Sequence, residues 1–209
     1  GETQRVNLAA ALGSELVSTQ FVLDEPSVGL HPRDTARLVK AVQALQRKGN
    51  SVLMVEHDLD CIAAAEEVIE LGPRSGDLGG EVIFQDSVLK NGELPSSKPF
   101  DVEPAITQKA KAHLEIRNAT ARNLCGIDLD IPLNRFVCLT GVSGSGKSSL
   151  AIEVIQRSYD LHSRGQRTRS GENAVRGFKH FDQLLVVDQA PLAKSPRANI
   201  ATYSGLWDV

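Results

Sequence analysis

One glycine-rich segment of the chain reads Gly141-Val142-Ser143-Gly144-Ser145-Gly146-Lys147-Ser148. An apolar run at residues 136–140 precedes it and predicts a buried strand, and a helical pattern begins at Ser149. A glycine-rich turn between a strand and a helix N-terminus binds phosphate, because its backbone N–H groups converge on an anion. We therefore predict that residues 141–149 bind a nucleotide, with Lys147 directed at the β- and γ-phosphates and Ser148 at Mg²⁺.

Composition limits the class of protein. The chain has 209 residues, of which 41% are apolar and 23% charged, which is typical of a globular protein. Its formal net charge of −3 gives no overall positive surface for nucleic acid. No stretch resembles a membrane span or a signal peptide, so we expect no membrane partner and a cytoplasmic location. Cys61, Cys125 and Cys138 are widely spaced, which predicts buried, reduced thiols without a disulfide or a zinc site.

The remaining pattern predicts an α/β fold. Continuous apolar runs at 19–23 and 51–55 are typical of buried parallel strands, and alternating runs at 113–117 and 127–131 are typical of edge or antiparallel strands. Further strands are expected at 68–71, 81–84 and 184–188, and helices at 6–16, 33–48, 59–67 and 149–159. Proline and glycine between residues 90 and 111 predict a linker. The basic stretch 157–179 is either a solvated loop, which we favour, or a surface that faces phosphates.

Two of the apolar strands end in polar residues suited to ATP hydrolysis. Residues 21–23 lead into Asp24, which would hold the hydration shell of Mg²⁺, and Glu25, which would act as general base toward the attacking water. Residues 52–55 lead to His57, which would contact the γ-phosphate. Taken singly, an acidic strand end or a loop histidine is common. Ligands of parallel sheets bind at the carboxyl ends of the strands, so the three features together predict one catalytic site.

These motifs resemble those of the ABC-type ATPases. The resemblance rests on residues 1–5, 23–31, 55–58 and 141–149. More narrowly, the chain resembles the UvrA family, the damage-recognition subunits of the bacterial UvrABC excinuclease, through residues 24–34, 140–147, 188–191, 195–199 and 201–203. The resemblance implies ATP hydrolysis coupled to recognition of DNA damage in nucleotide excision repair. It also places Gln189 in the glutamine loop, as a nucleotide and Mg²⁺ contact.

The order of the motifs implies parts of two ATPase modules. By the resemblance, residues 1–90 form the C-terminal half of a first module, 91–112 a linker, and 113–209 the N-terminal half of a second module. The implied fold is a P-loop NTPase of ABC type, with a mostly parallel sheet, flanking helices and an antiparallel edge subdomain. Both ends of the chain are abrupt, so we expect a piece of a longer protein.

The resemblance also implies partners. These are ATP and Mg²⁺ for the chain, and damaged DNA, a second copy and the B subunit of the excinuclease for the longer protein. The family's zinc modules lie outside this sequence. The leading residues of the signature motif are absent before Gly1, and residues 113–126 contain no aromatic side chain to stack on adenine, so base specificity stays open.

Three alternatives remain at this point. The chain is a non-catalytic nucleotide-binding fragment, or it is an ABC-type ATPase of a transporter or a ribosome-associated protein, against which the linker and the motif order argue. In the third alternative the two halves fold as one permuted module. Asp24 and Ser148 would then share a Mg²⁺ site, which requires them to lie within about 10 Å of each other.

Overall fold

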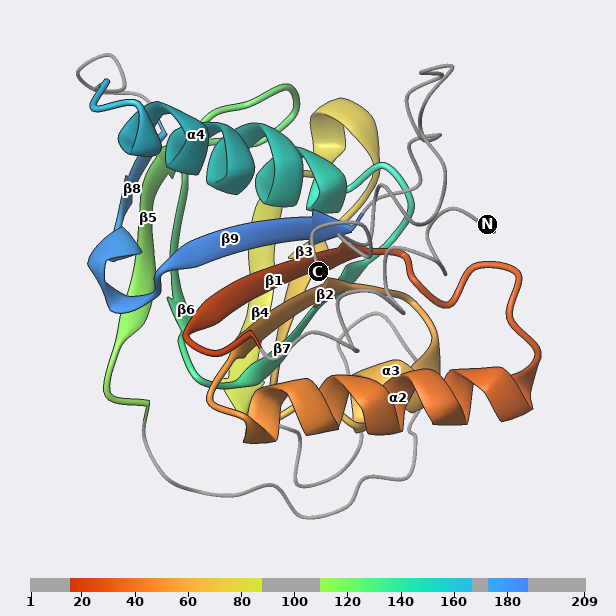
Figure 1. The fold of residues 1–209 in the computed structure, drawn as a ribbon. Coiled ribbons are helices and arrows are strands. Elements are labelled where there is room, and N and C mark those ends of the chain that lie inside the picture. Colours follow the sequence, from red (N-terminus) through yellow and green to blue (C-terminus); the bar gives the residue numbers. More distant parts are fainter. Residues whose placement is uncertain (1–15, 88–109, 167–172, 188–209) are drawn as a thin grey trace, which may run out of the picture.

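A computed structural model describes residues 16–87, 110–166 and 173–187 of the chain. A main sheet of six strands has the order β4-β3-β7-β2-β1-β9, and a small sheet has the order β6-β5-β8. Helices α2 and α3 cover one face of the main sheet, and the helix that ends in α4 lies over the other face (Figure 1). All main-sheet pairs are parallel except β3 with β4, and the small sheet is antiparallel. The predicted α/β class, with a mostly parallel sheet and a second antiparallel unit, is confirmed.

The elements have the following bounds. The main sheet contains β1 (Thr19–Asp24), β2 (Ser51–Val55), β3 (Glu67–Gly72), β4 (Glu81–Ser87), β7 (Phe136–Gly141) and β9 (Gln183–Val187). The small sheet contains β5 (His113–Ala119), β6 (Ile127–Pro132) and β8 (Ala174–Arg176). The helices are α2 (Pro32–Arg47), α3 (Leu59–Ala63), the π-helix η2 (Ser149–Gln156), which continues as α4 (Arg157–Ser163), and the 3-10 turns η1 (Gly76–Leu78) and η3 (Phe178–His180).

Strands of the second half of the chain pair with strands of the first half in the main sheet. Strand β7 lies between β3 and β2 and is parallel to both, and β9 pairs with β1. The described parts of 1–90 and 113–209 therefore share one sheet in this chain. That these two ranges, with the linker 91–112, correspond to two modules of a longer protein stays a prediction.

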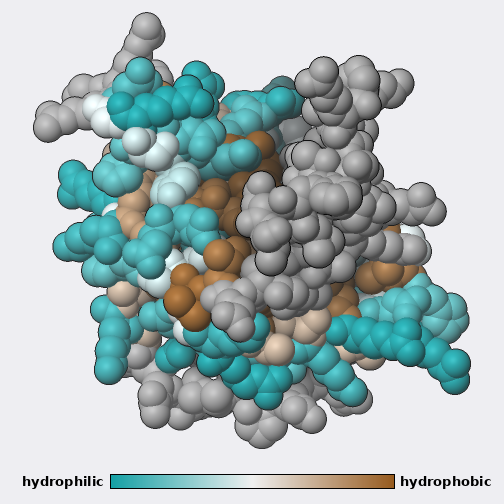
Figure 2. All heavy atoms as spheres, viewed as in Figure 1, coloured by the Kyte–Doolittle hydropathy of each residue, from teal (hydrophilic) through white to brown (hydrophobic). Residues whose placement is uncertain are grey.

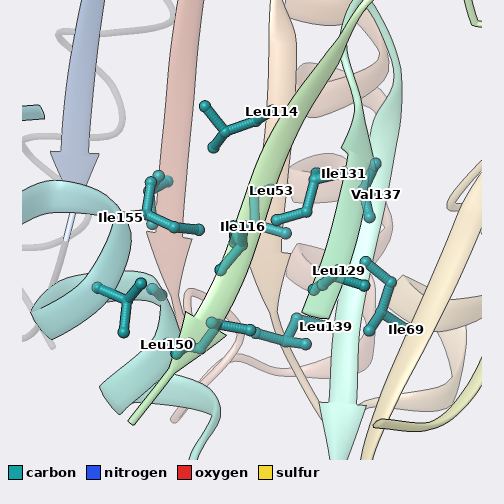
Figure 3. Close-up of a cluster of buried hydrophobic side chains, with 14 of the residues drawn as sticks. Leu53, Ile69, Leu114, Ile116, Leu129, Ile131, Val137, Leu139, Leu150 and Ile155 are labelled. Carbon is teal, nitrogen blue, oxygen red and sulfur yellow. The ribbon is translucent and has the colours of Figure 1, made fainter. Parts of the chain in front are cut away.

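Each face of the main sheet carries its own hydrophobic core. Successive residues of a strand point to opposite faces, so Cys138 packs with the α2 side while Leu139 packs with the other side. Figure 3 shows how side chains meet on that second side: Leu139 from the main sheet, Ile116 from the small sheet and Leu150 from η2. Because both faces are covered, β7 is apolar from Phe136 to Leu139 without alternation, as its sequence predicts.

Helix α2 agrees with its sequence pattern. The Nδ1 atom of His31 accepts a hydrogen bond from the backbone N–H of Arg33, and Pro32 occupies the first turn, where a missing N–H costs nothing. Leu38, Val42 and Leu45 are buried on one face, as predicted. This helix fills the space beneath β1 and β2 (Figure 1).

The structure corrects three expectations about local structure. The helix expected at 59–67 ends at Ala63, because Glu66 is drawn into the sheet: its N–H donates to the Phe136 carbonyl, and its Oε2 accepts from the Phe136 N–H. The basic stretch 157–179 is not one loop, since it contains α4, the short strand β8 and η3. Cys125 is exposed, whereas Cys61 and Cys138 are buried as expected; all three are free thiols, as predicted.

The surface follows the same layering. Figure 2 shows mostly hydrophilic side chains over the outer faces of α2 and α4, with hydrophobic side chains between them. Strand β9 forms one edge of the main sheet there, and Leu184, Leu185 and Val186 are half-buried. Within the described ranges, no helix combines the length and apolar character needed to cross a membrane.

The pairing of strands from both halves in one sheet predicts a single unfolding transition. Leu53 on β2 and Leu139 on β7 come from different halves of the chain and are fully buried in the same hydrophobic core. We expect Leu53→Ala and Leu139→Ala each to lower the free energy of unfolding by about 2–5 kcal/mol, because each leaves a cavity in a packed core. Urea unfolding followed by circular dichroism measures this. The control Leu78→Ala removes an exposed leucine and should change the free energy by less than about 0.5 kcal/mol. Two separate transitions would contradict the shared sheet.

Candidate nucleotide-binding site

The candidate site lies where three adjacent parallel strands end. Strand β7 leads into the phosphate-binding loop, β2 leads to His57, and β1 leads to Asp24 and Glu25. Because β7, β2 and β1 are neighbours in this order, their carboxyl ends meet at one edge of the main sheet. The predicted groups therefore come from one edge, although they are far apart in the sequence.

Glycine begins the loop for a steric reason. Gly141 has φ +131°, and a Cβ atom there would collide with the carbonyl oxygen of Leu71 on the neighbouring strand β3. Only a residue without a side chain allows β7 and β3 to approach so closely while the backbone turns away from the sheet. The loop then enters η2, where the N–H of Leu150 donates to the carbonyl of Gly146. This places a helix N-terminus directly behind the loop, as predicted.

Lys147 lies at the centre of the loop and is only 7% exposed. Its Nζ donates to the carbonyl oxygens of Gly141 and Val142, each at 3.0 Å. Burial lowers the pKa of Lys147, and the charges of Glu25 and Asp24 offset part of that shift. An ammonium group has three N–H donors, of which these carbonyls take two, so the positive charge is held within the loop itself.

Asp24 and Ser148 meet across the site. Ser148 Oγ donates to Asp24 Oδ1 at 3.1 Å, which joins the end of β1 to the start of η2. This distance satisfies the requirement for a permuted module, in which the two residues serve one site. A carboxylate and a hydroxyl are oxygen ligands of the kind that Mg²⁺ uses together with phosphate oxygens and water, so these residues fit that ion.

Glu25 adopts a strained backbone conformation. Its φ is +48°, a region that few residues other than glycine occupy, and such strain is concentrated at functional sites. The backbone N–H of Glu25 donates to the carbonyl of Val55 at 2.9 Å, which holds the end of β1 against the end of β2. The side chain is half-buried and close enough to Lys147 to influence its pKa.

His57 is positioned by its neighbour Glu56. The His57 side chain is exposed, and its backbone N–H donates to Glu56 Oε2 at 3.1 Å. Glu56 is fully buried, and it also accepts from the N–H groups of Ser27 at 2.7 Å and Asp58 at 3.4 Å. One carboxyl group thus ties the loop after Glu25 to the segment that carries His57.

Sequence reasoning missed two residues of this edge. The position of Glu56 could have indicated its role. A charged residue directly after a continuous apolar strand either is hydrogen-bonded where it is buried or lies outside the sheet. Asn123 donates from Nδ2 to the Gly144 carbonyl, and no local pattern indicates it, since this contact spans 21 positions. The predicted contact Gln189 and the signature remnant at 1–5 lie outside the described residues.

The described residues contain no group of three or more His, Cys, Asp or Glu side chains placed to hold a metal ion.

Burial raises the pKa of the Cys61 thiol, and the nearby Glu56 and Asp58 add to the shift. Burial likewise raises the pKa of Cys138. Both thiols are buried in the core, and their raised pKa disfavours the thiolate form that reacts.

Comparison with known proteins identifies similar chains. The chain is 40% identical over 219 residues to UvrABC system protein A of Helicobacter pylori (strain ATCC 700392 / 26695), covering 100% of this chain and 23% of that protein. It is 40% identical over 219 residues to the Aquifex aeolicus protein of the same name, covering 100% and 24%. The expected resemblance is confirmed, and the chain spans about a quarter of the length of these relatives.

Among solved structures, the crystal structure of UvrA2 from Deinococcus radiodurans matches with 37% sequence identity and a TM-score of 0.41. That match covers 96% of this chain and 25% of the other. No protein-family model matches the chain.

The contacts of Glu56 predict a large loss of stability when it is removed. In Glu56→Ala, three backbone N–H groups at the edge of the site lose their acceptor. We expect the free energy of unfolding to fall by about 2–4 kcal/mol, since three partly buried donors lose a charged acceptor at once. The control Glu115→Ala, at an exposed position of β5, should change it by less than about 0.5 kcal/mol. Equal effects in urea unfolding would contradict the role given to Glu56.

Proposed function

We propose that the chain binds ATP with Mg²⁺ at the carboxyl ends of β7 and β1 and hydrolyses it. The observation that carries this proposal is the hydrogen bond between Ser148 Oγ and Asp24 Oδ1, at 3.1 Å. It joins the residue that follows Lys147 to the acidic end of β1. A phosphate-binding loop and an acidic strand end that meet in this way are the two parts that an ATPase site requires.

The residues have distinct roles in this proposal. Backbone N–H groups of residues 141–149 and the Lys147 ammonium hold the β- and γ-phosphates. Ser148 and Asp24 would hold Mg²⁺, which neutralises developing charge on the phosphate oxygens when bound. Glu25 accepts a proton from the attacking water, and its fixed backbone sets the direction of the carboxyl group. His57 and Gln189 are proposed to contact the γ-phosphate and the Mg²⁺ environment.

We further propose that the chain is part of a UvrA-like ATPase that recognises damaged DNA in nucleotide excision repair. Similarity along the whole chain to proteins named UvrABC system protein A supports this assignment. It favours the assignment over an ATPase of a transporter or a ribosome-associated protein. Damaged DNA, a second copy and the B subunit of the excinuclease are proposed partners of the longer protein, in the cytoplasm.

A second candidate function is nucleotide binding without hydrolysis. The side chain of His57 favours it, because it is exposed and no hydrogen bond among the described residues holds it toward the phosphate-binding loop. Both candidates share the phosphate-binding loop and differ only in the catalytic groups. Substitutions in the loop and at Glu25 therefore separate them.

The proposed roles predict different effects for two substitutions. Lys147→Ala should raise the Kd for Mg–ATP by about ten- to a hundredfold, because it removes a charged hydrogen-bond donor to phosphate. Glu25→Gln should leave the Kd within about threefold and lower the hydrolysis rate by about a hundredfold or more, because it removes the general base. Calorimetry and phosphate release measure these quantities.

The control for both is Lys40→Ala, at an exposed position on α2, which should change neither quantity. Tight binding without any hydrolysis by the unaltered chain would support the second candidate. If the unaltered chain and Lys147→Ala bind Mg–ATP with equal affinity, the proposed site is wrong.

The lowered pKa of Lys147 predicts that ATP affinity falls at alkaline pH. Burial lowers this pKa in the free protein, and negative phosphates would raise it again in the complex. Binding therefore takes up a proton once the pH passes the free-protein pKa, and the Kd rises from there upward. The fall should begin below the range in which ordinary lysines titrate, about pH 10.4. Lys147→Arg, which stays charged, should show no such fall in calorimetric titrations across pH.

A further inference from the structure

We infer that Asn123 is a positioning residue for the phosphate-binding loop, and that it acts together with residues 75–80, here called the bracing loop. The inference rests on the proposed function, because it assumes that residues 141–149 bind phosphate. It assigns a role to two segments that lie outside the sequence motifs. Neither Asn123 nor the bracing loop needs to touch the nucleotide.

The contacts converge on two carbonyl groups of the phosphate-binding loop. The Gly144 carbonyl accepts from the backbone N–H of Gly76 at 3.0 Å and from Asn123 Nδ2 at 3.1 Å. The Ser145 carbonyl accepts from the N–H of Gly80 at 3.1 Å. Asn123 Nδ2 also donates to the Gly76 carbonyl at 3.1 Å, so its amide joins the bracing loop to the phosphate-binding loop.

These contacts orient the donors that phosphate needs. In a planar trans peptide unit the carbonyl and the following N–H point in opposite directions. Holding the Ser145 carbonyl toward the bracing loop therefore directs the Gly146 N–H to the opposite side. Holding the Gly144 carbonyl fixes the Ser145 N–H as well, which donates within the loop to the Val142 carbonyl at 3.2 Å and so closes the turn that precedes Gly146. Converging N–H groups form the anion-binding concavity.

The loop needs an external brace because its own sequence does not stiffen it. Glycine at 144 and 146 allows many backbone conformations, and an unbraced loop would have to be ordered when the nucleotide binds. The bracing loop itself is packed against residue 123: Gly80 has φ +81°, and a Cβ atom there would collide with the Asn123 carbonyl oxygen. The N–H of Cys125 donates to the Gly80 carbonyl at 3.1 Å.

The test compares Asn123→Ala with a matched control. Gln85 also donates two hydrogen bonds from one amide, to Glu67 Oε1 at 2.8 Å and to the Asp130 carbonyl at 2.7 Å, but in the sheets rather than at the loop. We expect Asn123→Ala to raise the Kd for Mg–ATP about tenfold, which corresponds to about 1.4 kcal/mol. Both variants should lower the urea midpoint by a similar amount, because each loses two hydrogen bonds. Gln85→Ala, however, should leave the Kd for Mg–ATP within about twofold.

Hydrogen–deuterium exchange gives a second measurement that does not require ATP. Amides of residues 142–147 should exchange faster in Asn123→Ala than in the unaltered chain or in Gln85→Ala. Asn123→Asp keeps the side-chain size but removes both donors, so it should reproduce the effect if the alanine variant fails to fold.

Unchanged exchange in both Asn123 variants, or equal changes of Kd in Asn123→Ala and Gln85→Ala, would overturn the inference. If the unaltered chain does not bind Mg–ATP, the proposed function fails, and the exchange comparison still decides whether Asn123 orders the loop.

Discussion

The parallel pairing of β7 with β3 on one side and β2 on the other determines where the candidate site forms. It fixes the end of β7, and with it the phosphate-binding loop, at the edge where β2 and β1 also end. Glu66 secures the start of β7 through Phe136, and the Glu56 N–H donates to the Leu139 carbonyl near its end. Ser148 and Asp24 are separated by 124 positions in the sequence, and this insertion brings them into hydrogen-bond contact.

The sequence predicts the elements better than their arrangement. Strands covered on both faces contain a continuous apolar run, so β1, β2 and β7 could be recognised with nearly correct bounds. The early end of α3 depends on the Glu66–Phe136 pairing, and the contact of Asn123 depends on two loops that meet only in the fold. The three residues of β8 are too few for a periodic pattern. The motifs predicted that the ends of β1, β2 and β7 carry the site residues. Only the pairing of strands from both halves shows that these three ends lie next to one another.

The charges of the site explain why a cation belongs to the proposed chemistry. Asp24 and Glu25 place two carboxyl groups near the single ammonium of Lys147, which is already held by two carbonyls of its loop. A triphosphate would bring further negative charge to this edge, and Coulomb repulsion is strong where water is partly excluded. The helix N-terminus and the loop N–H groups supply only partial positive charge. Mg²⁺ between Asp24, Ser148 and the phosphates would remove the remaining imbalance.

The shared sheet also bears on a longer protein. Each half of the chain has an apolar sheet face that must be buried, and in this chain the halves bury each other. If the chain is part of a longer protein with two modules, as the order of its motifs predicts, each half has a second complementary half in the same polypeptide. The two pairings then compete, and effective concentration within the chain decides between them. The contact of Asp24 with Ser148 belongs to the pairing seen here. In the competing pairing, Asp24 would face the serine of the phosphate-binding loop of its own module, and Ser148 would face the aspartate of its own module. The same types of oxygen ligand would then meet Mg²⁺ and phosphate.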